Sequence, residues 1–447
     1  MSAGDTIAAI STPPGRGGIG VVRVSGRGTA DVARSILGFL PIPRQAVLGD
    51  FRDARGELID RGIALFFPAP RSYTGEDVLE LQGHGGPLVM QQLLARCVAA
   101  GSRMAEPGEF TRRAYLNNRI DLAQAESVAD LIDAASIEAA RSAARSLAGD
   151  FSRRIEALAS AIIDLRVHVE ACIDFPEEEI DASDRAAIER KRISIAADLR
   201  RLLASANQGV VLREGLTVAL IGRPNVGKSS LLNRLAGEEL AIVTPIPGTT
   251  RDPVRATIAI EGVPVHLIDT AGLRESEDPV ERIGVERTWA AVQTAGAALL
   301  IDAVDEGAGI DERIAARLPH ALPRAYVLNK IDLAERRPEG PVAPVGEGVF
   351  LPVSAKSGAG LPALRSWLLE RAGWRPAGEG VFMARARHIQ ALCEALECVT
   401  RAGSTGEVFE LAAEELRLAA AALGRIVGEV SADDLLGEIF GRFCIGK

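Results

Sequence analysis

A short apolar run and the glycine-rich loop after it constrain the fold of this chain more than any other stretch. Residues 216–221 (LTVALI) predict a buried strand, and residues 222–229 follow with the sequence GRPNVGKS. Glycines in this loop let backbone amides approach phosphate oxygens, while Lys228 neutralises them and Ser229 offers a hydroxyl to Mg²⁺. Residues 230–235 predict a helix whose N-terminus adds positive potential. We interpret the stretch as a nucleotide phosphate loop, with a ligand-free glycine turn as the alternative.

A second motif follows a later strand of the same predicted sheet. Residues 265–268 predict that strand, which leads into Asp269-Thr-Ala-Gly272. A carboxylate at a strand end can hold the Mg²⁺ shell through water, and the amide of Gly272 can approach a γ-phosphate. The next residue is Leu273, where Ras-like GTPases carry a glutamine that positions the attacking water. Leucine cannot do this, so either hydrolysis is negligible or another group supplies the function.

Two further motifs predict which base is bound. Residues 325–328 predict a strand that ends in Asn329-Lys330-Ile331-Asp332. The Asp332 carboxylate can accept hydrogen bonds from the N1–H and exocyclic amine of guanine, and adenine offers neither. We therefore predict GTP, with ATP as an alternative that Asp332 disfavours. The Ser354-Ala355-Lys356 stretch follows another apolar run and would support the base.

The order and spacing of these motifs predict a doubly wound, Ras-like GTP-binding domain. A threonine in the loop of residues 244–252 can ligate Mg²⁺ when the γ-phosphate is present, so we expect this loop to order with GTP and loosen after hydrolysis. The predicted GTP-binding residues are Asn225, Val226, Gly227, Lys228, Ser229, Ser230, Thr244, Thr249, Thr250, Asp269, Gly272, Asn329, Lys330, Asp332, Ser354, Ala355 and Lys356.

The rest of the chain predicts two other kinds of domain. At 447 residues the chain is too long for one core. Its start mixes strand and helix signals, whereas apolar residues recur at helical spacing on both sides of the nucleotide-binding stretch. We infer one discontinuous helical domain with the nucleotide domain inserted in it. The expected boundaries are 1–118 for an α+β N-terminal domain, 119–214 and 374–447 for the two helical parts, and 215–373 for the G domain.

The N-terminal region has its own element pattern. Its alternating and helical apolar spacings set the expected elements. The expected strands are 6–10, 19–24, 62–67 and 78–81, and the expected helices are 29–37 and 87–99.

Net charge and cysteine content narrow the class of protein. The formal net charge of −9 argues against a chain coated in basic nucleic-acid-binding surface, although it leaves room for a local patch. Five scattered cysteines argue against a disulfide framework and favour a reducing cytoplasm. We find neither a signal-peptide pattern nor an apolar run that approaches a membrane span. Cys444 is either a small buried residue or a reactive thiol with Arg442 and Lys447 nearby, and both interpretations stay open.

Several stretches of the sequence resemble a known protein family. The stretches GRPNVGKSSLLN, PGTTRD, DTAGLRE, VERIG, NKID and SAK resemble the G domain of the tRNA-modification GTPase family called MnmE or TrmE. Outside that domain, DTIAAISTPPGRGGIGVVRVSG, YTGEDVLELQGHGG, PGEFTRRAYLNNRIDLAQAE and the terminal FCIGK resemble its other signatures. The resemblance runs from Asp5 to Lys447 in the same domain order.

The resemblance implies a tRNA-modifying function. The N-terminal domain is similar to folate-binding one-carbon transfer domains, and in this family it binds a tetrahydrofolate derivative (5-formyl- or methylene-tetrahydrofolate) and forms a homodimer. With a flavoprotein partner that carries FAD and uses NADH (MnmG, or GidA), expected in a heterotetramer, the family adds an aminomethyl or carboxymethylaminomethyl group to C5 of the wobble uridine of certain tRNAs. The family's GTP hydrolysis is stimulated by K⁺ and accompanies G-domain dimerisation.

The resemblance also assigns residue roles. Lys228 would act in catalysis, and Glu281 would orient the attacking water, although read alone it is a surface carboxylate. Arg119 stands where relatives commonly carry lysine, which puts its folate contact in question. Arg23 read alone is the solvent-facing position of a strand. The implied ligands are Asn225, Thr249 and the backbone of Thr244 and Ile246 for K⁺, Ser229 and Thr250 for Mg²⁺, and Arg23, Glu80, Arg119 and Lys447 for folate.

Two other functions are compatible with the same sequence features. The first is a stand-alone regulatory GTPase, for example in ribosome assembly, whose end domains only bind partners. The second is a scaffold that binds GTP without turnover. Folate binding to the N-terminal domain argues against the first, and phosphate release in K⁺ argues against the second.

Overall fold

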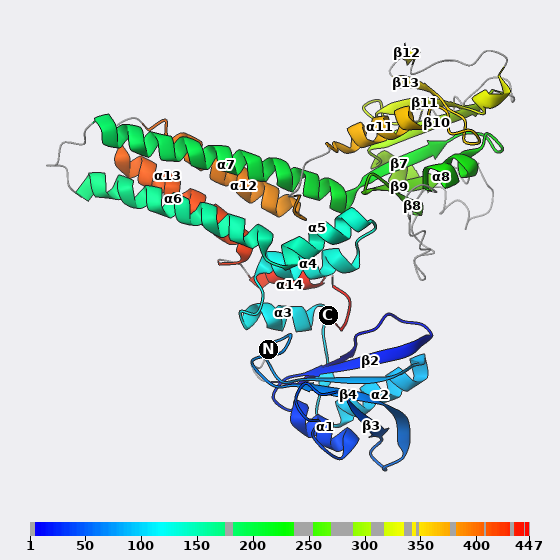
Figure 1. Cartoon of the computed structure of the whole chain (residues 1–447), viewed down its shortest axis with the longest axis vertical. Coiled ribbons are helices and arrows are strands. Elements are labelled where there is room, and N and C mark those ends of the chain that lie inside the picture. Colours follow the sequence, from blue (N-terminus) through cyan, green and yellow to red (C-terminus); the bar gives the residue numbers. More distant parts are fainter. Residues whose placement is uncertain are drawn as a thin grey trace. The chain divides into compact units, whose positions relative to one another are not determined.

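The computed structural model (Figure 1) divides into two compact units, residues 1–129 with 424–447 and residues 130–423. The four domain boundaries expected from the sequence are finer than this division and stay a prediction. The structure describes residues 5–174, 182–236, 254–269, 289–304, 317–334, 342–345, 348–375, 381–405, 408–429, 433–441 and 443–446.

A sheet with two helices on one face forms the main layer of the first unit. Its elements are β1 (Ile7–Ile10), β2 (Gly17–Ser25), α1 (Thr29–Leu37), β3 (Val47–Arg52), β4 (Leu58–Phe67), β5 (Val78–Gly85), α2 (Pro87–Ala99) and β6 (Arg103–Met104). The strand order is β3-β4-β5-β2-β1-β6, and β1 and β6 are the parallel pair. Val32 of α1 and Leu93 of α2 pack against Val22 of the sheet in one buried cluster. This is the α+β domain that the sequence predicts.

The end of the chain packs beside the helices that follow this sheet. These helices are α3 (Glu109–Leu116), α4 (Leu122–Ile132) and α14 (Asp433–Gly441). Leu122 at the start of α4 is fully buried in a cluster with Phe440 and Phe443. The Tyr115 hydroxyl donates to the carbonyl oxygen of Gly428 at 2.8 Å. The C-terminal motif is therefore anchored to the N-terminal part of the chain.

A sheet buried on both faces forms the G domain. Its elements are β7 (Leu216–Ile221), α8 (Lys228–Ala236), β8 (Val254–Ile260), β9 (Val263–Asp269), β10 (Ala297–Ala303), β11 (Arg324–Asn329), β12 (Val342–Val345), β13 (Gly348–Pro352) and α11 (Leu361–Ala372). The order is β12-β13-β11-β10-β7-β9-β8, with antiparallel pairing at the two edges only. Leu220 and Leu299 pack on one face, and Ala219 and Ala298 pack on the other. Such double burial explains the nearly continuous apolar strands.

Long helices from both sides of the G domain pack together. They are α5 (Ile137–Leu147), α6 (Asp150–Asp174), α7 (Ala182–Glu214), α12 (Ala386–Ala402) and α13 (Phe409–Val427). Figure 1 shows α6, α7, α12 and α13 side by side, and Arg192 of α7 donates to the carbonyl oxygen of Val399 in α12 at 3.3 Å. The discontinuous helical domain is thus confirmed. Within the described ranges, the helices are too short or too polar to cross a membrane.

Candidate functional site

The phosphate loop joins β7 to α8 in the conformation its glycines permit. Asn225 and Gly227 have positive φ angles of 68° and 89°. A Cβ at Gly227 would lie 2.4 Å from Nδ2 of Asn329, and one at Gly222 would lie 2.4 Å from the carbonyl oxygen of Ile301. Both positions therefore require glycine for close approach. The helix begins at Lys228, two residues before the sequence-based expectation, since the turn is complete at Gly227.

The ammonium group of Lys228 lies over its own loop. Its Nζ donates to the carbonyl oxygens of Gly222 and Arg223 at 2.7 and 2.8 Å. These bonds hold the lysine beside the backbone that would wrap a phosphate. Ser229 and Ser230 follow at the first turn of α8, and both are exposed. A helix N-terminus with exposed hydroxyls suits an anion and its metal ion.

Asn329 links three motifs that are far apart in sequence. Its Nδ2 donates to the carbonyl oxygen of Val226 at 2.9 Å, and its Oδ1 accepts from the backbone N–H of Ala355 at 3.1 Å. Asn329 is only 1% exposed, so these bonds are made away from solvent. The phosphate loop, the 329–332 motif and the 354–356 motif are consequently fixed as one assembly.

The carboxylate of Asp332, which is predicted to bind the base, is also held by a hydrogen bond. Ser354 is fully buried, and its Oγ donates to Oδ1 of Asp332 at 2.6 Å. The same Oγ accepts from the backbone N–H of Ser357 at 3.0 Å. Lys330 has a left-handed φ of 62°, and Lys356 is exposed at the surface. The structure therefore brings the predicted guanine-binding residues together beside the phosphate loop.

Part of the predicted site lies outside the described residues. Asp269 ends β9 directly opposite Leu220 of β7, so its backbone stands at the same sheet edge as the phosphate loop. Its side chain is not described. The other predicted residues outside the description are Thr244, Ile246, Thr249, Thr250, Gly272, Glu281 and Lys447.

The candidate folate residues Arg23 and Glu80 form an ion pair. They stand opposite each other on β2 and β5, and Nη2 of Arg23 lies 2.9 Å from Oε1 of Glu80. The guanidinium also lies over the rings of Tyr73 and Phe110, at 5.5 and 5.8 Å from their centroids. A half-buried cation between a carboxylate and two aromatic rings offers polar and stacking contacts for a planar, polar ligand.

The C-terminal motif lies near the start of the same sheet. The backbone N–H of Gly108 donates to the carbonyl oxygen of Cys444 at 3.5 Å, and Oγ of Ser11 donates to that of Gly446 at 3.1 Å. The Cys444 side chain is exposed. Arg119 is also exposed, with its side chain beside Gly75. Both ends of the chain thus contribute to one region of the first unit.

The sequence does not reveal a partly buried charge network beside this region. Arg103 and Arg113 donate to Oε1 of Glu109 at 2.5 and 2.9 Å, and each also pairs with Asp5 at 2.6 Å. Arg113 pairs with Glu76 at 3.0 Å as well. Only the spacing of Glu109 and Arg113, four apart on one helix, gave a local signal.

The arginines of this network lower the pKa values of two of its carboxylates, Glu109 and Asp5. Burial opposes the charge on Glu109, but hydrogen bonds from Arg103 and the Glu106 amide outweigh it and lower the pKa of Glu109 below its ordinary value. Burial likewise opposes the charge on Asp5, and hydrogen bonds from Arg103 and Arg113 lower the pKa of Asp5. Glu109 and Asp5 are therefore held as carboxylates at neutral pH.

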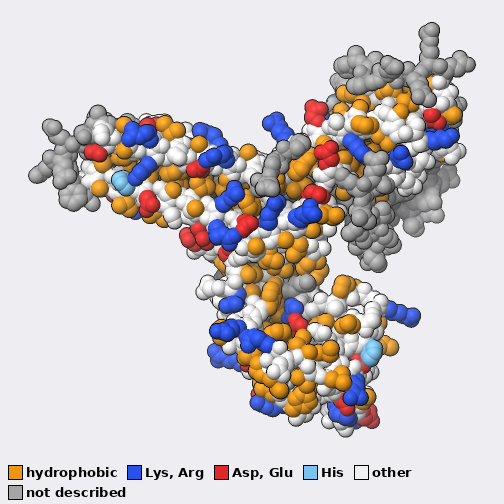
Figure 2. Space-filling model, viewed as in Figure 1, with side chains coloured by type: hydrophobic (Ala, Val, Ile, Leu, Met, Phe, Trp, Pro, Cys, Tyr) orange, Lys and Arg blue, Asp and Glu red, His pale blue; other side chains and the backbone are white. Residues whose placement is uncertain are grey.

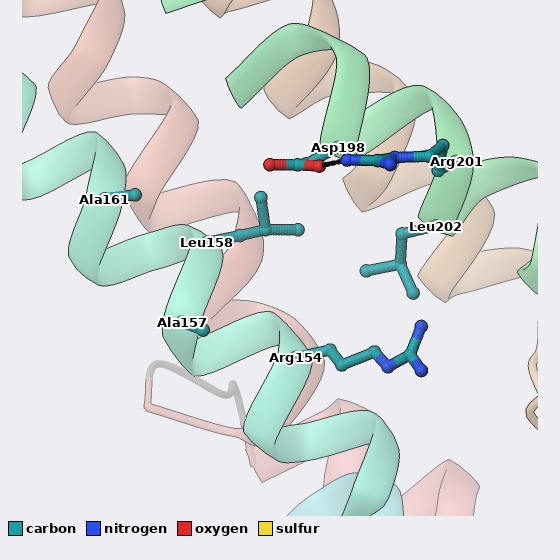
Figure 3. Close-up of a pocket in the computed structure, with 7 residues that line it drawn as sticks. All are labelled: Arg154, Ala157, Leu158, Ala161, Asp198, Arg201 and Leu202. Carbon is teal, nitrogen blue, oxygen red and sulfur yellow. Dashed lines mark hydrogen bonds and ion pairs between the residues drawn. The ribbon is translucent and has the colours of Figure 1, made fainter. Parts of the chain in front are cut away.

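The helical bundle contains a groove to which the sequence assigned no role. It has a volume of about 410 Å³ and lies between α6 and α7. Figure 3 shows Leu158 and Leu202 at its sides and a dashed ion pair between Asp198 and Arg201. On the face drawn in Figure 2, basic and acidic side chains are interspersed over these helices. Among the described residues, no predicted site residue lines this groove.

Comparisons with known proteins cover nearly the whole chain. Residues 6–119 match the family described as GTP-binding protein TrmE N-terminus, and residues 122–444 match the MnmE helical domain. A tRNA modification GTPase MnmE from Azoarcus sp. (strain BH72) is 58% identical over 447 residues, covering 99% of this chain and 98% of its own. The protein of the same name from Nitrosospira multiformis is 56% identical over 454 residues and covers 100% of both chains. A solved FeoB G domain from T. maritima aligns with 35% of this chain and 98% of its own at 21% identity, with a TM-score of 0.25 that is too low to carry an argument.

Proposed function

The chain belongs to the MnmE family of tRNA modification GTPases, and we propose that its GTP hydrolysis serves the modification of C5 of the wobble uridine, position 34, in certain tRNAs. The main support for this function is the nucleotide site, whose motifs are joined by Asn329. The family matches cover residues 6–119 and 122–444 of the same chain. The reaction at that site converts GTP and water to GDP and phosphate. The proposed tRNA product carries an aminomethyl or carboxymethylaminomethyl group.

The chain's own residues bind and orient GTP. Lys228 would exchange the carbonyl oxygens of its loop for β- and γ-phosphate oxygens. Asp332, already oriented by Ser354, would accept the two guanine donors. Glu281 would hold the attacking water where Leu273 cannot.

Two cations would complete the site. Ser229 is exposed at the first turn of α8 and would hold Mg²⁺ together with Thr250. Bound Mg²⁺ neutralises charge that develops on the phosphates. Asn225 is exposed in a left-handed backbone conformation and would hold K⁺. The further K⁺ ligands proposed are Thr249 and the backbone of Thr244 and Ile246.

The first unit would bind the one-carbon donor. The Arg23–Glu80 pair, with its neighbouring rings, supports a site for a tetrahydrofolate derivative, and Arg119 and Lys447 are proposed to extend it. Cys444 is exposed at the adjoining C-terminus and is proposed as a functional thiol. We further propose a cytoplasmic homodimer that works in a heterotetramer with the flavoprotein MnmG, which carries FAD and uses NADH.

Nucleoside analysis of tRNA from cells lacking this protein tests the proposal. We expect the modified wobble uridine to disappear and to return when the gene is restored. Unchanged wobble uridine would favour the stand-alone regulatory GTPase.

The cation assignment has its own test. No glutamine follows Gly272, so a monovalent cation is expected to stabilise charge that develops on the phosphates. Phosphate release from GTP should be faster in K⁺ than in Na⁺, and Asn225→Ala should reduce that preference. Equal rates in the two salts would contradict the K⁺ site, and no turnover in either would favour the scaffold.

A further inference from the structure

The segment that leads from the end of the G domain to α12 is called here the return connection, and its described residues are 373–375 and 381–385. These residues lie against the last turns of α7. The Gln208 side chain of α7 donates to the carbonyl oxygen of Gly373 at 3.2 Å and accepts from the backbone N–H of Arg375 at 2.8 Å. A Cβ on Gly209 would lie 1.7 Å from the carbonyl oxygen of Phe382, so only glycine allows this approach. The outgoing connection is the short link at Gly215, which joins the end of α7 to β7. The described parts of the return connection, residues 373–375 and 381–385, therefore lie beside the end of α7, where the outgoing connection starts.

One buried carboxylate ties these two connections together. Oδ1 of Asp130 accepts from Nε of Arg213 at 3.0 Å and from Nη2 of Arg385 at 2.8 Å. Arg213 is the second-last residue of α7, and Arg385 stands at the N-cap of α12. The side chain of Asp130 is 7% exposed. A buried carboxylate shared by two guanidinium groups loses both pairs when its charge is removed.

The return connection is held a second time by α5. Oγ of Ser142 and Nη2 of Arg145 both donate to the carbonyl oxygen of Val381, at 3.0 and 2.9 Å. Oγ of Ser146 accepts from the backbone N–H of Met383 at 3.1 Å. Residues 381–385 are thus fixed to the same α4–α5 segment that carries Asp130.

The same segment also reaches the G domain. Oγ of Ser136, the N-cap of α5, donates to the carbonyl oxygen of Gly262 in the turn between β8 and β9 at 2.5 Å. Gly215, with a φ of 63°, is packed so closely that a Cβ would lie 2.2 Å from the carbonyl oxygen of Pro264. Strand β9 starts at this contact and ends at Asp269, beside the phosphate loop. One strand therefore leads from the α4–α5 segment to the nucleotide site.

We infer that Asp130 is a positioning residue for the G domain: it locks the outgoing and return connections into one hinge. Strand β9 connects this hinge to the sheet edge that carries the phosphate loop, and Asp130 holds both connections together. The inference goes beyond the proposed function and does not depend on the chemistry performed on tRNA. It concerns residues that touch neither nucleotide nor folate.

Hydrogen–deuterium exchange of the full chain tests this inference. In Asp130→Asn, amide exchange should rise roughly tenfold in peptides covering both 208–216 and 381–388, because both connections open more often. The matched control is Glu214→Gln, since Glu214 also pairs with Arg213, at 3.2 Å, but from an exposed position. The control should exchange like the wild type, and Asp130→Glu should restore most of the protection. GTP turnover is followed in the same samples, so loss of the GTPase is distinguished from loss of the hinge.

A second variant keeps the test decisive if Asp130→Asn does not fold. Arg385→Gln should also speed exchange in residues 208–216, although the substitution lies in the return connection. A rise confined to residues 381–388, or to α4 in the Asp130 variant, would overturn the hinge. Equal exchange in Asp130→Asn and Glu214→Gln would overturn it as well.

Discussion

The nucleotide site and the candidate folate site each contain a basic side chain, and the two side chains are held in different ways. Lys228 bonds to neutral carbonyl oxygens of its own loop, five and six residues away. Arg23 bonds to the carboxylate of Glu80, which lies 57 residues away on another strand. Both of these Lys228 bonds lie within the loop that would wrap the phosphates, whereas the Arg23–Glu80 pair fixes the arginine to another strand. We therefore expect Lys228 to change partners when nucleotide binds, whereas Arg23 keeps Glu80 and presents a preformed surface.

The regions around the two sites also differ in the kind of interaction that holds them together. The first unit relies on a network of long-range ion pairs around Glu109 and Arg113. The nucleotide site relies on Asn329, a neutral side chain that bonds to two backbone groups. Charge substitutions within the network of Glu109 and Arg113 should thus lower the stability of the first unit, whereas charge substitutions at the nucleotide site should mainly lower ligand affinity.

The largest expected effect is on the stability of the first unit. Glu109→Gln removes the charge that pairs two arginines from a position 4% exposed, and it should lower the free energy of unfolding by about 3–5 kcal/mol. Thermal unfolding followed by circular dichroism measures this. Glu57→Gln, whose exposed carboxylate pairs with Arg55 at 3.2 Å, is the matched control and should change little.

The stabilisation that Glu109 provides should depend on pH. Because the pKa of Glu109 is lowered in the folded protein, its stabilisation is fully present above its ordinary value of 4.5 and is lost as the pH falls through the lowered pKa. The difference between wild type and Glu109→Gln should accordingly shrink on acidification. A constant difference down to strongly acid pH would contradict the assigned ion pairs.

The next effect is on base recognition. Asp332→Asn should weaken GTP binding by about 2–4 kcal/mol, because a charge-assisted pair of hydrogen bonds is lost, and should favour xanthine nucleotides. Isothermal titration with GTP and its xanthine analogue measures the change. The control is Asp302→Asn, at the end of β10, where the carboxylate accepts from its own neighbour Ala303 at 2.9 Å. Unchanged GTP affinity in the Asp332 variant would remove the guanine assignment.

A smaller effect is expected at the folate site. Arg23→Ala should weaken binding of 5-formyl-tetrahydrofolate by about 1.5–3 kcal/mol, the usual range for hydrogen bonds to a charged group, and leave GTP hydrolysis near normal. Arg34→Ala, which breaks an exposed pair with Asp31, is the control. Equal folate affinity in both variants would place folate elsewhere, and a matching loss of GTP turnover would show that the two regions are not independent.

The sequence predicts the local features of both regions well and the long-range ones poorly. The helices expected at 29–37 and 87–99 are found with those bounds, because Gly38 and Pro87 mark their ends locally. The phosphate loop is likewise one continuous stretch. Strands β3 and β8 were not expected, since each is recognisable mainly through its antiparallel neighbour.

In the candidate sites, too, the sequence predicts the local motifs but not the long-range contacts. Asn329 was found through its motif, but the bond to Val226, 103 residues away, depends on how the parallel strands align. The Arg23–Glu80 pair depends on the register of β2 against β5, and a shift of one residue would separate it. The network of Asp5, Arg103 and Arg113 has no contiguous motif, so only the folded chain reveals it.

In the proposed function, two separately built sites serve one tRNA modification, and the Glu281→Ala variant shows whether GTP hydrolysis is coupled to that modification. We expect GTP binding and folate binding to stay near normal, turnover to fall roughly 10²-fold or more through loss of the water-positioning group, and wobble-uridine modification in cells to be lost. The measurement is nucleoside analysis of tRNA from cells that carry this variant alone, with turnover measured on the purified protein. A variant confirmed as hydrolysis-dead that still modifies tRNA normally would show that hydrolysis is not coupled to the modification.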